Sequence, residues 1–242
     1  MSATPERGGS THDVSTLTPA CSCYHVVVAL GIFNMTEYHK IQTVFKRDMD
    51  SPNKNLIIGD WTLPEFHCLE NCRWQFTEKV DGTNIRVIWE DQTITFAGRT
   101  ERATIPQPLR HSLEGLFCPL VEAFRKEFND RTVVLYGEGY GGSIQAGQKY
   151  SIEPDFILFD IKIGRWWLQR EDLVEIADKL GLTVVPTVGS GTLHDAITMV
   201  RAGLQSTFGD FEAEGIVARP ITELMDRSGR RIITKIKSRD FQ

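Results

Sequence analysis

The spacing of hydrophobic and polar residues changes several times along the chain, and each change predicts a new element. Strict alternation predicts two strands that a turn at Asp91 joins into a hairpin, at 84–89 and 93–96. Short apolar runs predict four further strands, at 132–136, 155–163, 215–218 and 231–236. Apolar residues three or four positions apart predict helices at 116–128, 171–180 and 193–204. Because helices and hairpin-like strand pairs are interspersed, the pattern predicts a mixed α+β domain with a mainly antiparallel sheet.

The N-terminal region lacks this periodicity. Residues 1–20 are rich in Ser, Thr, Pro and Gly, which is typical of a disordered segment. We expect 1–34 to be a disordered or dispensable extension and 35–242 to be the folded domain, and one interpretation is that translation begins at Met35. An alternative is that the apolar run at 26–33 is the core of a secretory signal, although Arg7 is the only base before it. The run is far shorter than the roughly 18–20 residues that span a bilayer, so no membrane contact is expected.

Composition and charge narrow the class of protein. The chain has 242 residues, of which 41% are hydrophobic and 24% charged, and these values exclude a collagen-like, coiled-coil or wholly disordered chain. Its 27 basic and 32 acidic residues give a net charge of −5, which excludes a globally basic nucleic-acid coat but not a local basic face. The five cysteines match neither a standard zinc pattern nor a disulfide framework, which predicts a reducing, intracellular and cytoplasmic location.

The first segment with candidate chemistry surrounds Lys79. It lies near the end of a short predicted strand at 77–80, between Glu78 and the Asp81–Gly82 turn signal. A lysine in such a place is a plausible nucleophile if burial or nearby cations lower its pKa from the ordinary value of about 10.4. Taken alone, however, the segment is more typical of a solvated hairpin turn with an ion pair than of a nucleophile.

A second segment places Lys235 and Lys237 near the C-terminus. On a strand these two lysines share one face while Ile236 faces the core. Paired ammonium groups suit a phosphate, and they would also lower the pKa of a third lysine nearby. Taken alone, the pair fits an exposed edge strand protected by lysines better. The isolated histidines, among them His39, are expected at the surface or in the core.

Two carboxylates stand next to predicted strands. Glu138 lies within a G-x-G-x-x-G pattern at 137–142, but no helical pattern follows, so we reject a dinucleotide-binding turn. We expect Glu138 at a strand end beside a flexible glycine loop, where it could accept hydrogen bonds from ribose hydroxyls. Glu214 begins an apolar strand and could hold Mg²⁺, which favours carboxylate oxygens, although many strands begin with Glu.

Taken together and in order, these segments resemble the covalent nucleotidyltransferase superfamily, and most closely its ATP-dependent RNA ligases. The six family motifs that they resemble are motif I at 79–84, the arginine motif at 98–99, motif III at 136–138, motif IIIa at 156–160, motif IV at 214–217 and motif V at 235–237. Each motif alone is weak, but six in the right order outweigh the separate alternatives. The resemblance implies a nucleotidyltransferase, ATP-grasp-like ligase core with mainly antiparallel sheets flanked by helices.

The resemblance also implies a reaction and a set of roles. Lys79 would attack the α-phosphate of ATP, AMP would pass to an RNA 5′-phosphate, and a 3′-hydroxyl would displace it. The other roles would be adenine contact for Glu78 and Phe159, ribose contact for Arg99 and Glu138, phosphate contact for Asn84, Lys235 and Lys237, and a site for Mg²⁺ or Mn²⁺ at Glu214 with Asp81.

Two features bear on the branch of this superfamily. DNA ligases and mRNA-capping guanylyltransferases usually have Arg at the position of Asn84, so Asn favours the RNA ligases. The sequence ends five residues after Lys237, so we expect no appended oligonucleotide-binding domain, and a partner protein could help to hold RNA ends or a nicked duplex. The alternatives are a capping-type guanylyltransferase, a DNA ligase core, or a non-catalytic module that binds nucleotides or RNA ends.

Overall fold

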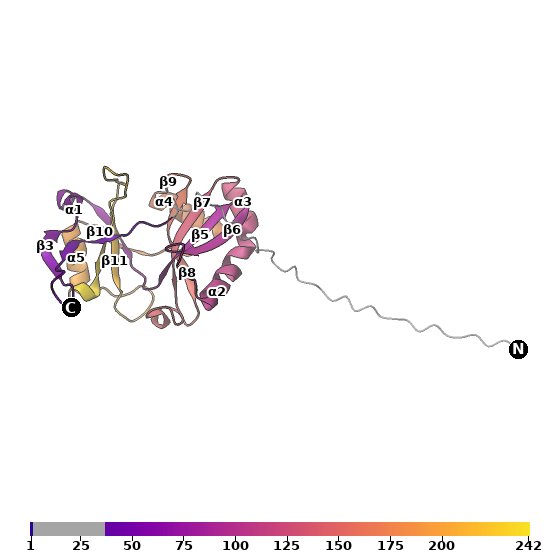
Figure 1. The fold of residues 1–242 in the computed structure, drawn as a ribbon, viewed down its shortest axis with the longest axis horizontal. Helices are drawn as coiled ribbons and strands as arrows, with labels where there is room; N and C mark the ends of the chain where they lie inside the picture. Colours follow the sequence, from indigo (N-terminus) through magenta and orange to yellow (C-terminus); the bar gives the residue numbers. More distant parts are fainter. Residues whose placement is uncertain (2–36) are drawn as a thin grey trace.

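The computed structural model describes Met1 and residues 37–242, in which two five-stranded sheets form two lobes (Figure 1). The predicted extension 1–34, its apolar run and the proposed start at Met35 lie outside the described residues, apart from Met1. Among the helices that the structure describes, none has the length and apolar character needed to cross a membrane. The α+β class and the mainly antiparallel pairing are confirmed.

The first sheet lies in the lobe that holds the C-terminus. Its strands, in spatial order, are β1 (Gln42–Thr43), β12 (Thr234–Lys237), β11 (Gly215–Pro220), β4 (Trp74–Glu78) and β10 (Thr187–Gly191). Only the β1–β12 pairing within this sheet is parallel. Helix α5 (Leu193–Arg201) packs its buried side chains against Trp74, Phe76 and Ile216 of the sheet. Helix α1 (Pro64–Cys68) adds Phe66 to the same core.

The second sheet is antiparallel throughout. Its strands, in spatial order, are β6 (Thr93–Gly98), β5 (Thr83–Glu90), β7 (Val133–Tyr140), β8 (Asp155–Ile163) and β9 (Trp166–Trp167). Helices α2 (Gln107–Phe117), α3 (Val121–Phe128) and α4 (Arg170–Leu180) share one large hydrophobic core with this sheet. A separate ribbon of β2 (Phe45–Arg47) and β3 (Leu56–Trp61) lies near α1 and α5 (Figure 1). The described residues also form the 3₁₀ turns η2 (Cys118–Leu120), η3 (Gly147–Lys149) and η4 (Ser238–Asp240).

Most predicted elements form, and one helix differs for a clear reason. Asp91 and Gln92 both have positive φ, as a two-residue hairpin turn requires, and they join β5 to β6. The predicted helix at 116–128 is instead divided into α2, η2 and α3. Pro119 lies at the division, where its missing N–H and the steric bulk of its ring oppose a continuous α-helix. The helical spacing therefore identified α3 correctly, but it extended the predicted helix toward the N-terminus across the break between α2 and α3.

The environment of Glu138 differs from the sequence prediction. Strand β7 continues to Tyr140, so Glu138 lies inside a strand and not at its end beside a glycine loop. Its two glycine neighbours permit close packing. A Cβ on Gly137 would stand 2.2 Å from the Phe156 ring, and one on Gly139 would stand 2.5 Å from Leu109. Glycine inside a strand often marks such a close approach, which the sequence pattern alone does not distinguish from a loop.

A β-bulge shapes β8 where it faces the first sheet. Tyr136 pairs with Asp160 and Gly137 pairs with Leu158, so Phe159 is the extra residue. A bulge shifts the alternation of side chains along a strand. Before it, Leu158 belongs to the helix-covered core, whereas after it Ile161 does so. Phe159 and Asp160 consequently both lie on the side of the sheet away from the helices, with Tyr38 in contact with each.

Candidate active site

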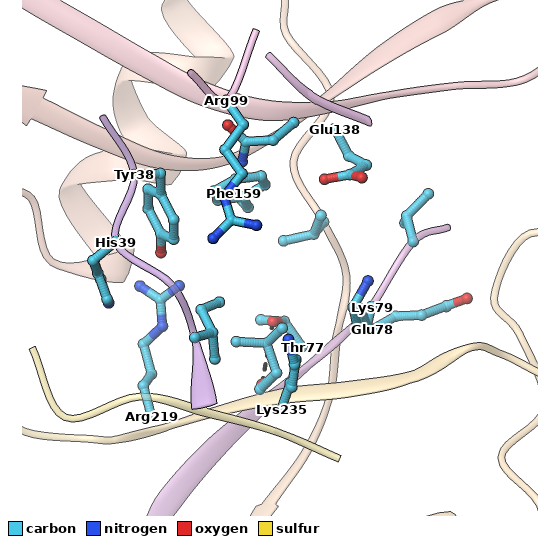
Figure 2. Close-up of a pocket in the computed structure, with 15 residues that line it drawn as sticks. Tyr38, His39, Thr77, Glu78, Lys79, Arg99, Glu138, Phe159, Arg219 and Lys235 are labelled. Carbon is cyan, nitrogen blue, oxygen red and sulfur yellow. Dashed lines mark hydrogen bonds between the residues drawn. The ribbon is translucent and has the colours of Figure 1, made fainter. Parts of the chain in front are cut away.

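A cavity lies where the two sheets meet, and both sheets supply its walls. Figure 2 shows Arg99 and Glu138 on one side of it and Lys79 and Lys235 on the other. The first sheet contributes residues from β4, β11 and β12, the second from β5, β7 and β8, and the segment before β1 closes one end. The polar and aromatic residues around it are Tyr38, His39, Thr77, Glu78, Lys79, Asn84, Arg99, Glu138, Phe159, Arg219 and Lys235.

Lys79 is held beside Glu214 by the backbone as well as by charge. Lys79 directly follows β4, and its N–H donates to the carbonyl of Gly215 over 2.9 Å. Its ammonium Nζ lies 2.5 Å from Oε2 of Glu214, while Nζ of Lys237 lies 2.5 Å from Oε1. Burial opposes ionisation of Glu214, yet the two lysines hold the pKa of this carboxyl below its ordinary value. One carboxylate thus holds the predicted nucleophile and one motif V lysine together.

The second motif V lysine faces the cavity itself. Lys235 and Lys237 are partly buried on one face of β12, and Ile236 between them is buried, as the alternation predicts. Burial, together with the positive charges of Lys237, Lys79, Arg99 and Lys40, lowers the pKa of Lys235 to about 8. An anion in the cavity would relieve this repulsion.

The second sheet supplies groups of a different kind. Glu138 on β7 has its pKa raised to about 8, mainly by burial. Asn84 on β5 has a buried Oδ1 with no hydrogen-bond partner among the described residues. Arg99 directly follows β6 and points into the cavity, near Phe159 from the bulge (Figure 2). A cation, a carboxyl, an amide and an aromatic ring therefore line one wall.

Glu78 points away from the cavity centre in Figure 2. The hydrogen bonds that its carboxylate accepts come from one loop, at 206–207. Its side chain is 1% exposed. Oε1 accepts a hydrogen bond from Ser206 Oγ over 2.6 Å, and Oε2 accepts bonds from the N–H and Oγ1 of Thr207. Glu78 therefore anchors the loop at 206–207 beneath the cavity. Its expected contact with adenine stays a prediction.

The expected metal ligands lie at the edge of the site. Glu214, Asp81 and Lys237 do not line the cavity, although the charges of all three influence the pKa of Glu138. The Asp81 N–H donates to Tyr150 Oη over 3.3 Å. Within the described part of the chain, no three His, Cys, Asp or Glu side chains are grouped so that they could hold a metal ion by themselves.

Sequence reasoning missed a buried polar cluster that closes one end of the cavity. Asp160 is fully buried and accepts hydrogen bonds from Tyr38 Oη (2.6 Å), Arg219 Nη1 (3.1 Å) and Arg231 Nη1 (2.9 Å). Burial opposes its ionisation, but the two guanidinium groups keep the pKa of Asp160 below its ordinary value. A single Asp within the apolar run Phe156–Ile161 was the available signal, since a buried carboxylate needs partners.

His39 also lines the cavity, contrary to the expectation that it has only a surface or core position. Its ring stacks on Tyr38 with 4.8 Å between centroids. Burial and the charge of Arg231 lower the pKa of His39 to about 4. The imidazole is therefore neutral at pH 7 and offers a flat, uncharged face at the end of the cavity opposite Lys79. Its isolation in sequence gave no indication of this place.

Comparison with known proteins assigns the class of protein. The family model described as RNA ligase matches residues 73–237, which include Lys79 and both motif V lysines. The chain therefore belongs to the RNA ligase family. No curated protein sequence matches the chain.

Solved structures with a similar fold include RNA ligases of Naegleria gruberi. A lysine-to-alanine variant with ATP and Mn is 21% identical with a TM-score of 0.58, and the match covers 74% of this chain and 52% of that one. The ligase with PPi is 22% identical with the same TM-score, covering 74% and 53%. A second such variant with ATP and Mn is 20% identical, covering 86% and 61% at a TM-score of 0.58. The chain thus spans between half and two thirds of the length of these ligases.

Proposed function

We propose that this chain is the catalytic core of an ATP-dependent RNA ligase that works through a covalent Lys79–AMP intermediate. The observation that carries the proposal is the position of Lys79 in a cavity between two sheets, with Glu214, Lys235 and Lys237 beside it. Family membership supports the reaction class, and neighbouring ligase structures that contain ATP, AMP or PPi with or without Mn support the nucleotide.

In the first step a bond forms between Lys79 Nζ and the α-phosphorus of ATP. The bond from that phosphorus to the bridging oxygen breaks, and pyrophosphate leaves with the electron pair. Lys79 must first lose a proton, because an ammonium group has no lone pair with which to attack. Lys235 and Lys237 would oppose the negative charge that spreads over the phosphate oxygens in the transition state.

The remaining cavity residues suit the nucleoside. Phe159 offers an aromatic face from the bulge in β8, and His39 adds a neutral ring at the same end. Arg99 and Glu138 are placed to hold ribose hydroxyls, since a protonated Glu138 both donates and accepts hydrogen bonds. Asn84 has an unused buried acceptor that a phosphate-bound water or a hydroxyl would satisfy.

Glu214 and Asp81 are the carboxylates that would hold Mg²⁺ or Mn²⁺. Magnesium is usually bound by one or two carboxylates together with substrate phosphates and water, so the lack of a larger acidic cluster among the described residues does not conflict with this assignment. When bound, the cation would supply further neutralisation of phosphate charge. Both oxygens of Glu214 contact lysines here, and adenylylation of Lys79 would remove one of these ammonium charges.

The later steps use RNA ends. A 5′-phosphate oxygen attacks the phosphorus of Lys79–AMP, Lys79 leaves, and a 5′–5′ adenylylated end forms. The 3′-hydroxyl then attacks the 5′-phosphate phosphorus, a phosphodiester forms and AMP leaves. Both steps need the same neutralisation of phosphate charge as the first, which is why one cavity can serve all three.

The test is transfer of label from ATP to protein. Protein, Mg²⁺ and ATP labelled at the α-phosphate are mixed, denatured and separated. We expect an acid-labile label on the wild type and none on Lys79→Ala, whereas the matched exposed variant Lys126→Ala should be labelled normally. Absence of label on the wild type, or label on Lys79→Ala, would refute the proposal. Labelling by GTP would point to a capping-type enzyme, and sealing of DNA nicks alone would point to a DNA ligase.

A further inference from the structure

A second cavity borders the first and has an unusual charge. Seven of its lining residues are cationic, and no carboxylate lines it, although the whole chain carries a net charge of −5. We call it the basic groove. Its cations are Lys40, Lys46, Arg47, Lys54, Lys235, Lys237 and Arg239. The neutral residues that line it include Gln42, Thr43, Asn53 and Thr62, all of which carry hydrogen-bond donors.

Apart from Lys235 and Lys237 of motif V, the basic groove is built by parts of the chain that the ligase motifs do not include. The β2–β3 ribbon and the loop between its strands supply Lys46, Arg47 and Lys54, and η4 supplies Arg239. We call the cavity between the two sheets, which Lys79 lines, the nucleotide cavity. Among the described residues, only Ile41 and Lys235 line both the basic groove and the nucleotide cavity. The two cavities are therefore adjacent, and most of the cations of the groove lie outside the nucleotide cavity.

Several of these cations form no ion pair among the described residues. Lys46 pairs with Asp60, Arg47 with Asp240, and Lys237 with Glu214. In the part of the chain that the structure describes, no carboxylate pairs with the side chains of Lys40, Lys54, Lys235 or Arg239. Like charges gathered in one groove repel one another and gain when an anion enters. The Oγ1 of Thr62 is also buried without a hydrogen-bond partner among the described residues.

The size of the basic groove indicates what kind of anion it suits. Its volume is about 670 Å³, compared with about 170 Å³ for the nucleotide cavity. Pyrophosphate, the small product of adenylylation, would fill only part of it. A row of cations without carboxylates is the usual electrostatic footprint of a nucleic-acid backbone. Because the groove meets the nucleotide cavity at Lys235, a strand lying in it would present its end beside Lys79.

We propose that the basic groove binds the backbone phosphates of the RNA strand whose end enters the nucleotide cavity. This inference rests on the proposed ligase function, because it takes RNA as the substrate. It assigns contacts with the RNA strand, which the ligase motifs leave unexplained, to residues 40–62 and 239.

The experiment compares the double variant Lys54→Gln/Arg239→Gln with the wild type. Both side chains are exposed and lie outside the nucleotide cavity, and glutamine removes the charge while keeping most of the length. Lys126→Gln is the control, since Lys126 is an exposed lysine on α3 without an ion pair in the described chain. For each protein we measure the affinity for a 5′-phosphorylated single-stranded RNA over a range of salt, and the covalent labelling by ATP.

We expect the double variant to be labelled as well as the wild type but to bind RNA more weakly. Each lost phosphate contact should reduce the slope of log affinity against log salt by about 0.7, so the double variant should lose about 1.4. An unchanged slope, or an equal loss in Lys126→Gln, would overturn the inference.

The same proteins distinguish the two sources of phosphate. If the groove serves the pyrophosphate of ATP, the double variant should be labelled poorly, or should resist inhibition by added pyrophosphate, while its RNA affinity stays normal. That result would overturn the assignment to RNA. If the wild type shows a steeper salt dependence of RNA affinity than the double variant but takes no label from ATP, the ligase proposal alone is refuted.

Discussion

At the residue scale, two carboxyl groups near Lys79 have opposite environments. Burial raises the pKa of Glu138 to about 8, whereas Lys79 and Lys237 overcome burial and hold the pKa of Glu214 below its ordinary value. At pH 7 Glu138 is therefore mainly protonated and Glu214 is ionised. One site thus offers a neutral hydrogen-bonding acid and a fixed negative charge, which is how enzymes assign different roles to identical groups.

The raised pKa of Glu138 predicts a pH dependence of stability. An ordinary Glu titrates near 4.5, so between this value and about 8 the folded state keeps a proton that the unfolded state has lost. The contribution of Glu138 to stability is thus fully present below about pH 4.5 and is lost as pH rises to about 8. The variant Glu138→Gln cannot titrate, so its unfolding free energy should rise relative to that of the wild type from about pH 4.5 to about pH 8, and the difference should stay constant above that. Urea unfolding at each pH measures this difference.

The control for this measurement is Glu153→Gln, which changes an exposed carboxylate without an ion pair in the described chain. Its unfolding free energy should follow that of the wild type across the same pH range. A constant difference between Glu138→Gln and the wild type would contradict the raised pKa.

A second prediction at this scale concerns Lys237. Its ammonium contacts Glu214 over 2.5 Å and would oppose phosphate charge in the transition state. Loss of one such electrostatic contact typically lowers a rate about 10²–10³-fold. We expect Lys237→Ala to slow self-adenylylation by that factor in single-turnover labelling. Lys126→Ala should react at the wild-type rate, and a Lys237→Ala rate equal to that of the wild type would exclude this role.

At the element scale, the site depends on backbone features that side-chain patterns conceal. The bulge in β8 turns both Phe159 and Asp160 away from the helices. Gly82, between β4 and β5, lies against β7, where an added Cβ would stand 2.3 Å from the Gly139 carbonyl oxygen and 2.9 Å from Glu138 Cγ. The connection after Lys79 thus fits against the strand that carries Glu138 only because residue 82 has no side chain.

The variant Gly82→Ala should therefore be costly. Forcing a methyl group into a packed site usually costs about 1–3 kcal/mol, and here it would also displace Glu138. We expect a lower unfolding free energy in urea and slower self-adenylylation. Gly115→Ala is the matched control, because Gly115 is exposed in the last turn of α2 and an added Cβ there meets nothing within 4 Å. It should instead stabilise the protein by about 0.5–1 kcal/mol through helix propensity.

These features also explain how far the sequence could predict the structure. The β5–β6 hairpin and α4 followed from alternation, helical spacing and the turn residues Asp91 and Gly181. The meeting of Lys79, Lys235 and Lys237 was expected from ordered motifs rather than from local pattern. The bulge at Phe159, the glycines inside β7 and the cavity positions of Tyr38 and His39 were missed. Each of these depends on a contact between distant segments, which short-range periodicity does not record.

At the scale of the whole molecule, Asp160 joins the two lobes. It lies on β8 of the second sheet, while Arg219 lies on β11 of the first, and Tyr38 approaches from the segment before β1. Arg231, just before β12, completes the cluster and also stacks against Trp167, with Cζ 4.4 Å from the ring centroid. The distance between the walls of the nucleotide cavity is therefore fixed by a buried ionic network next to it.

Removal of the Asp160 charge should destabilise the protein strongly. Asp160→Asn leaves Arg219 buried without its counter-charge, and it removes one of the two carboxylates that pair with the buried Arg231, which keeps Glu223. Breaking such a buried pair costs about 3–5 kcal/mol. Urea unfolding would measure the loss. Glu175→Gln, which breaks an exposed pair with Lys179 one helical turn away, should cost no more than about 0.5 kcal/mol. Equal losses of unfolding free energy in the two variants would show that the buried network stabilises the protein no more than an exposed ion pair does.

Lys235 forms part of the wall of both cavities, and this shared position makes their occupancies interdependent. An anion bound in either cavity favours the protonated form of the Lys235 amine, whose pKa of about 8 lies close to physiological pH. The resulting charge then changes the attraction felt by a ligand on the opposite side. By thermodynamic linkage the effect has equal size in both directions, so nucleotide and polynucleotide would each alter the affinity for the other through a single proton.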